Sequence, residues 1–141
     1  MSAMIKRFSH HTIYVTDQDV AKDFYVNKLG FDVNTDAEMG DFRWLTVSPP
    51  NQHYMQLILM PLIPSPMMDA ATCDKLKELL KAGHMPSGVF DTDDCRATYA
   101  DLVAKGVEFT AEPKEEIYGV ATILKDPFGN WYSLSESKPI K

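Results

Sequence analysis

The side chains that could act as nucleophiles or bind a metal ion are few in this sequence and widely spaced. Cys73 and Cys95 form no CxxC pair and have no neighbouring histidine, so they indicate neither a zinc site nor a cysteine nucleophile. No G-x-S-x-G turn and no glycine-rich phosphate loop occurs. The acidic run at 91–94 offers oxygen ligands, but its place before a helical segment favours helix capping. The charged segment at 113–117 favours a solvated loop.

Composition describes one acidic domain. The chain has 141 residues, 45% of them hydrophobic, with 14 Lys+Arg against 20 Asp+Glu and a net charge of -6. An acidic protein repels phosphate backbones and anionic lipid, which argues against nucleic-acid and membrane partners. No apolar run approaches the roughly 20 residues that span a bilayer. With two cysteines expected as free thiols, we expect a cytoplasmic protein.

Two segments of the chain are similar to each other, which indicates a duplicated module. Residues 13–33 align with residues 89–109 at an offset of 76, which pairs Gly30 with Gly106. Each segment predicts a strand, a helix that aspartates cap and glycine ends, and a second strand.

Two more strands are expected in each half, so that the order is β-α-β-β-β, twice. They are joined by turns rich in Pro, Asn and Gly. The predicted strands cover residues 42–47, 54–60, 120–124 and 131–135.

The two modules are predicted at 5–60 and 85–137, with a linker at 61–84 between them. The linker begins with prolines and continues as an amphipathic helix over about 69–82, with Leu76, Leu79 and Leu80 as its apolar stripe. This helix is expected to cover the core, while a lid or a dimer arm is the alternative.

The opening HTIYVTDQDVAKDFYVNKLGF and the closing DPFGNWYSL resemble the vicinal-oxygen-chelate superfamily, which includes glyoxalases, extradiol dioxygenases and bleomycin-resistance proteins. The resemblance covers nearly the whole chain. It implies a single α+β domain, 1–141, in which two tandem βαβββ modules form a curved-sheet cup around a small-molecule site. It also implies a homodimer, but it does not specify the reaction, because one fold hosts many activities.

In the metal-dependent members of this superfamily, four side chains in the cup hold a divalent ion such as Fe, Mn, Ni, Zn or Mg, which acts as a Lewis acid. The corresponding positions here are His11, Gln56, Ser87 and Ser133. Gln56 is a neutral donor, serine hydroxyls bind transition metals poorly, and the set contains no carboxylate. We therefore expect no metal ion and no other cofactor.

Three further candidate ligands are expected on the opposite sheet face, because side chains alternate along a strand: His10, His53 and Glu136. His84 lies in a loop that alternation does not constrain, so a metal site, if present, would use His11, Gln56 and His84. For His11, burial by a hydrogen bond and polar recognition of a ligand are weighed equally, and both are favoured over metal ligation.

Aromatic side chains complete the expected cup. Trp44, Trp131 and Tyr54 are predicted to supply stacking surfaces, with His11 and Gln56 as the polar recognition groups. The leading hypothesis is a small-molecule-binding protein, for an antibiotic or an aromatic metabolite, whose metal site is degenerate. The alternative is a metal-dependent lyase, isomerase or dioxygenase in which His84 or Glu136 replaces a missing ligand. A third hypothesis is a scaffold that acts through a partner surface.

Overall fold

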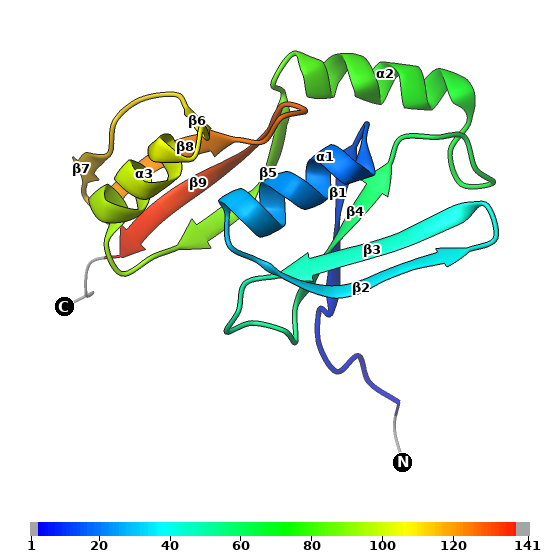
Figure 1. Ribbon diagram of the computed structural model, residues 1–141, viewed down its shortest axis with the longest axis horizontal. Coiled ribbons are helices and arrows are strands. Elements are labelled where there is room, and N and C mark those ends of the chain that lie inside the picture. Colours follow the sequence, from blue (N-terminus) through cyan, green and yellow to red (C-terminus); the bar gives the residue numbers. More distant parts are fainter. Residues whose placement is uncertain (1–2, 138–141) are drawn as a thin grey trace. The chain divides into compact units, whose positions relative to one another are not determined.

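The computed structural model describes residues 3–137 and contains two β-sheets with accompanying helices (Figure 1). The chain divides into two compact units, Met1–Pro61 and Leu62–Lys141. The fold is mixed α+β, as predicted. Each unit contains a strand, a helix and further strands in the expected order, with one additional short strand in the second unit.

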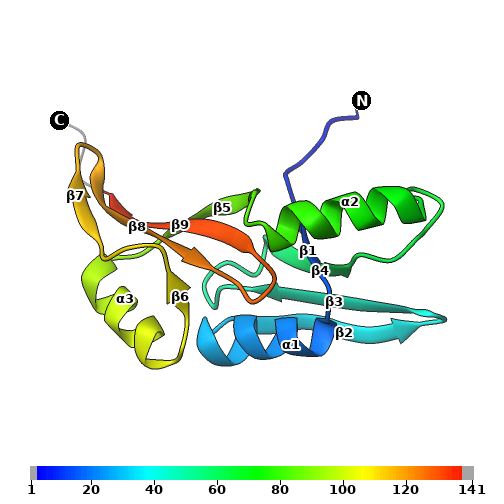
Figure 2. The ribbon, with the colours of Figure 1, turned by 90° about the horizontal axis from the view of Figure 1, so that it is seen from above.

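The first unit is a four-stranded sheet of order β1-β4-β3-β2, in which β1 and β4 are parallel and the other pairs are antiparallel. A helix runs along one face of this sheet (Figure 2). The strands are β1 (His10–Val15), β2 (Asp32–Met39), β3 (Phe42–Ser48) and β4 (Gln56–Pro61). The helix consists of α1 (Gln18–Lys22) and a π-helical continuation, η1 (Asp23–Lys28).

The helix of the first unit begins at Asp17, whose carboxylate accepts hydrogen bonds from the N–H groups of Asp19 and Val20. Its buried side chains are Ala21, Phe24 and Tyr25, at the i, i+3, i+4 spacing of a core-facing stripe. Val20 lies outside this stripe, and its side chain is 43% exposed.

Ion pairs connect this helix with β2 and β3. Arg43 contacts Asp36 at 2.8 Å and Asp19 at 2.7 Å, and Lys22 contacts the same Asp36 at 2.8 Å. The hydrogen bond from Arg43, and then that from Lys22, holds the pKa of Asp36 well below its usual range. The helix therefore lies on the sheet face from which Arg43 and Asp36 project.

The second unit contains a sheet of order β5-β9-β8-β6, with β7 also paired to β8. The β5–β9 pair is parallel and the others are antiparallel. α3 (Cys95–Ala104) packs against β8 and β9 and is capped by Asp94, which confirms that the acidic run caps a helix. The strands are β5 (Met85–Asp91), β6 (Glu108–Phe109), β7 (Lys114–Glu116), β8 (Gly119–Lys125) and β9 (Asn130–Ser137).

The DPFGN segment forms the turn between β8 and β9. Asp126 Oδ1 accepts hydrogen bonds from the N–H groups of Phe128, Gly129 and Asn130, and Oδ2 accepts one from Asn130 Nδ2 at 2.7 Å. Asp126 and Asn130 are 5% and 1% exposed, so the motif is a buried structural network.

α2 (Ala70–Lys81) is the predicted linker helix, and its residues Cys73 and Leu80 are buried. Leu79, expected in the apolar stripe, is 47% exposed because the buried positions instead follow residues 73, 76 and 80 around the helix. Both cysteines of the chain are free and buried. Across residues 3–137, no helix is both long and apolar enough to cross a membrane.

The β8–β9 turn lies very close to the end of α2, which makes Gly129 a sensitive position. A Cβ atom there would lie 1.8 Å from the carbonyl oxygen of Leu80. Gly129→Ala should lower the free energy of unfolding by about 3 kcal/mol or more, since it adds a backbone clash to the left-handed strain. Gly83→Ala is the matched control, because Gly83 also has a positive φ but open space around it, and should cost only about 1 kcal/mol. If urea unfolding showed the same loss of stability in Gly129→Ala and Gly83→Ala, the close approach of Gly129 to the Leu80 carbonyl would be contradicted.

Asp36→Asn should lower the free energy of unfolding by about 1 kcal/mol at pH 7, because the ion pairs are partly exposed. Since the pKa of Asp36 is lowered by folding, its contribution is complete above about pH 4 and is lost as the pH falls through that lowered pKa. Urea unfolding measured from pH 7 to pH 2 should therefore show that the difference in free energy of unfolding between the wild-type protein and Asp36→Asn decreases only at acidic pH. Asp41→Asn, at an exposed carboxylate, is the control. An Asp36→Asn difference unchanged down to pH 2 would argue against the pair.

Candidate functional site

The register between β1 and β4 determines which side chains of the first unit face away from the helix. His10 lies opposite Gln56, whereas His11 lies opposite Leu57. Residues opposite each other in a sheet project to the same face, so His10 shares its face with Gln56. The prediction that His11 shares this face, and that His10 points away from it, is wrong. A one-residue error in register exchanges the two faces, and alternation within β1 cannot reveal the register with β4.

His11 belongs instead to the face covered by the helix. Its neighbours on that face, Ile13 and Leu57, are 2% and 8% exposed. The His11 ring is half-buried and lies 6.2 Å from the ring of Phe8, centroid to centroid. The structure therefore places His11 beside the core of the first unit and away from Gln56.

On the opposite face, His10, Trp44, Thr46, Gln56 and Ile58 form a surface that we call the His10 face. Thr46 lies opposite Ile58, and the Trp44 ring lies 6.1 Å from the His10 ring. The Thr46 hydroxyl is buried and, within the described part of the chain, has no hydrogen-bond partner. A buried hydroxyl left unpaired costs about 1–3 kcal/mol, so this atom is a polar group that the described residues leave unsatisfied.

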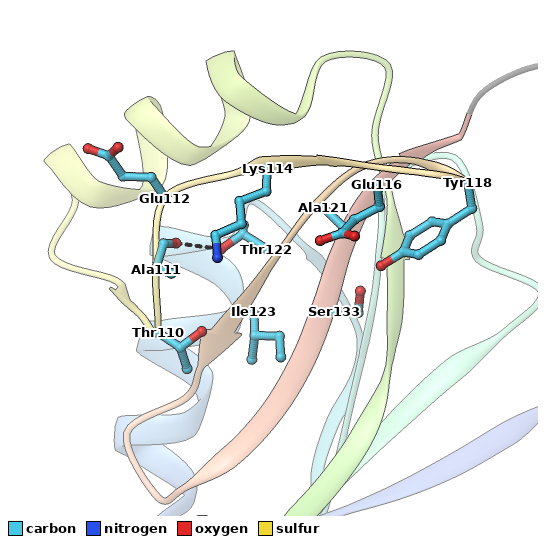
Figure 3. A pocket seen from close by; sticks show the side chains of 10 residues that line it. All are labelled: Thr110, Ala111, Glu112, Lys114, Glu116, Tyr118, Ala121, Thr122, Ile123 and Ser133. Carbon is cyan, nitrogen blue, oxygen red and sulfur yellow. Dashed lines mark hydrogen bonds between the residues drawn. The ribbon is translucent and has the colours of Figure 1, made fainter.

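Ser133 lines a cavity of about 220 Å³ in the second unit (Figure 3). Ala121, Ile123 and Ser133 lie on one face of β8 and β9, since Ile123 is directly opposite Ser133 and side chains alternate along β8. β7 and the residues around it supply the side wall of the cavity. The remaining lining residues are Thr110, Ala111, Glu112, Lys114, Glu116, Tyr118 and Thr122.

The segment between β6 and β7 is fastened to the sheet at this cavity. The Thr122 hydroxyl donates a hydrogen bond to the carbonyl oxygen of Ala111, and the N–H of Thr110 donates to the carbonyl oxygen of Ile123 at 3.0 Å. These bonds hold the wall of the cavity in place beside β8.

The structure does not bring Ser87 to this cavity. The register of β5 and β9 shifts between Pro86 and Gly88, so that Val89 lies opposite Ser133. The Ser87 hydroxyl lies 3.1 Å from both Asn130 Oδ1 and the carbonyl oxygen of Met85. Ser87 therefore extends the buried network of the β8–β9 turn.

The other predicted site residues lie in different settings. Trp131 projects from the same face of β9 as Ser133 and is half-buried. Tyr54, in the turn before β4, is 65% exposed. His84 is exposed, and its N–H donates to the carbonyl oxygen of Leu79 at 3.0 Å, where it helps to end α2. Glu136 Oε1 accepts a hydrogen bond from the N–H of Cys95 at 2.9 Å, so it caps α3.

The donor set does not fit a divalent metal ion. In the first unit the face that carries Gln56 offers one imidazole and one amide, and Ser133 in the second unit is a hydroxyl. Of the expected replacements, Glu136 has a carboxylate oxygen engaged at the start of α3, and His84 is exposed at the end of α2. Among residues 3–137, no three His, Cys, Asp or Glu side chains are grouped so that they could hold a metal ion.

Sequence reasoning missed the cavity residues Lys114 and Glu116. The segment at 113–117 was expected to be a solvated loop, whereas Lys114–Glu116 form β7, paired with β8. Three consecutive charged residues carry no apolar alternation, so the sequence offered no signal for this strand.

In each unit, the first strand pairs in parallel with the last strand, and this topology defines the class of fold. Comparison with known proteins defines the family. The model of the Glyoxalase/Bleomycin resistance protein/Dioxygenase superfamily matches residues 7–134. The chain belongs to this superfamily.

Several similar proteins span nearly the whole chain. The crystal structure of UcmS2 has 40% sequence identity and a TM-score of 0.88, covering 94% of this chain and 98% of UcmS2. TnmS3, an antibiotic binding protein from Streptomyces sp. CB03234, has 29% identity and a TM-score of 0.76, covering 97% of this chain and all of TnmS3. YurT of Bacillus subtilis (strain 168), an uncharacterized protein, is 37% identical over 120 residues, which are 84% of this chain and 90% of YurT.

Proposed function

We propose that this protein binds a small molecule, an antibiotic or an aromatic metabolite, and acts by reversible, stoichiometric capture. The observation that carries the proposal is the cavity of the second unit. In this cavity Ser133, which corresponds to a metal-ligand position of the superfamily, adjoins apolar and polar side chains. Apolar surface with a few polar groups is typical of ligand sites. The similarity to TnmS3, an antibiotic binding protein, supports the same function.

The size of the cavity indicates what it accommodates. Its volume of about 220 Å³ is below the roughly 300–1,000 Å³ typical of complete ligand pockets. We propose that it receives one end of the ligand. Trp131 is proposed as an additional stacking surface beside this cavity, and Tyr54 as a stacking surface of the first unit. Ser87 is not among the proposed binding residues, because its hydroxyl belongs to the network of the β8–β9 turn.

The His10 face is the second proposed recognition surface. Its members combine a tryptophan ring, an imidazole and an amide with the unpaired hydroxyl of Thr46. His10 therefore takes the role that the sequence assigned to His11. Binding is proposed to need no metal ion, because no three His, Cys, Asp or Glu side chains of residues 3–137 are grouped so that they could hold one.

A homodimer and a cytoplasmic location are also proposed. The dimer rests on the family resemblance. The location is supported by Cys73 and Cys95, which are free and buried, as expected for a protein of a reducing compartment.

Capture can be tested with bleomycin and tetracycline, by isothermal titration followed by recovery of the compound. We expect one bound molecule per chain and unchanged compound after release. Ser133→Phe should weaken binding by about tenfold or more, because the added ring occupies the cavity. Ser137→Phe, at the exposed end of the same strand and outside the cavity, is the matched control. Multiple turnovers of the compound would refute capture and favour the enzyme alternative.

Metal dependence is tested by elemental analysis of protein purified without chelator. We expect less than one Fe, Mn, Ni or Zn per chain and the same ligand affinity after treatment with EDTA. His10→Ala should weaken the binding of ligand several-fold without changing the metal content, whereas His11→Ala should affect mainly the stability of the first unit. Stoichiometric metal that is lost in His10→Ala would overturn the metal-free proposal.

A further inference from the structure

β7 places two opposite charges on the same side of the cavity. Lys114 and Glu116 are separated by one residue, so their side chains project to the same face of the strand, about 7 Å apart along the backbone. Figure 3 shows both side chains, together with Tyr118, extending from this edge over β8 and β9. The intervening Glu115 projects to the other face.

Neither charge is used by the fold. The ion pairs of the described residues involve other side chains, such as Lys105 with Asp101 at 3.0 Å, and no hydrogen bond described for residues 3–137 satisfies the ammonium of Lys114 or the carboxylate of Glu116. Both remain available to a ligand. In contrast, the hydroxyl of Thr122 donates to Ala111, so this buried polar group of the cavity is already satisfied.

The surroundings of the pair favour a flat, apolar body in the ligand. Ala121 and Ile123 line the cavity beside Ser133, and Tyr118 adds an aromatic ring at its edge. A planar ring system placed on this surface would present its long edge to β7.

The pair also fixes the polarity of that edge. A lysine ammonium only donates hydrogen bonds and an ionised carboxylate only accepts them. The ligand must therefore carry an acceptor opposite Lys114 and a donor opposite Glu116. A compound that lacks either group makes one charge-assisted hydrogen bond fewer at this exposed edge, which lowers its affinity.

We propose that this cavity selects fused-ring aromatic compounds that carry a carbonyl oxygen and a hydroxyl or amino group at the two ends of one long edge. This inference rests on the proposed function and specifies the ligand class of the same site. Lys114 binds the carbonyl oxygen, Glu116 accepts the hydrogen bond from the hydroxyl or amino group, and the rings lie on Ile123.

Three two-ring compounds small enough for the cavity test this specificity. Umbelliferone carries a carbonyl and a hydroxyl on the same long edge, coumarin lacks the hydroxyl, and β-naphthol lacks the carbonyl. In a mildly acidic buffer that keeps the hydroxyl of umbelliferone protonated, the wild-type protein should bind umbelliferone about tenfold more tightly than either of the other compounds, as measured by fluorescence titration.

Variants of β7 assign each preference to one side chain. Glu116→Met should abolish the preference for umbelliferone over coumarin but keep the preference for umbelliferone over β-naphthol. Lys114→Met should abolish the preference over β-naphthol but keep the preference over coumarin. Glu115→Met, a change of the same type on the opposite face, should keep both preferences. Circular dichroism should show that all three variants are folded, since the three side chains are exposed.

The outcomes separate this inference from the proposed function. Equal affinities for the three compounds, no binding of umbelliferone, or preferences that survive both substitutions would overturn the inference. The proposed function is tested separately, by the binding of bleomycin or tetracycline and by the loss of that binding in Ser133→Phe.

Discussion

The pairing register of the parallel strands is the constraint on which the site depends. In the first unit, the pairing of His10 with Gln56 sends Ile13, Leu57 and Leu59 toward the helix and turns His10 and Gln56 away from it. A shift of β1 by one residue would expose Ile13 and turn His10 toward the core, so burial of the core enforces the register. The composition of the proposed recognition surface is thus a consequence of how the core packs.

The second unit fixes its cavity by a different means, through buried hydrogen bonds. Asp126 and Asn130 organise the β8–β9 turn, and Ser87 joins them from β5. This network fixes β9, and with it the position of Ser133. The shift in register within β5 keeps Ser87 out of the cavity. The Ser87 hydroxyl, at a position that corresponds to a metal ligand in the superfamily, instead stabilises the turn.

Local sequence signals predicted most of the fold, because they act over short distances. Aspartate caps, glycine helix ends and the DPFGN turn each depend on neighbours in the chain, and Gly30 and Gly106 do adopt the positive φ expected of them. Residues that meet across strands were harder to predict. The exchange of His10 for His11 arose because register is a property of two strands distant in sequence, and β7 was missed because its three charged residues carry no apolar alternation.

The charged character of β7 has a second effect, on how the protein behaves among its own copies. β7 is a short strand at the margin of its sheet, and a margin of this kind offers unpaired backbone groups to other chains. Lysine and glutamate side chains discourage such pairing. A more apolar lining of the cavity would remove this protection. The proposed binding of a ligand and the resistance to aggregation therefore constrain the same two residues, Lys114 and Glu116.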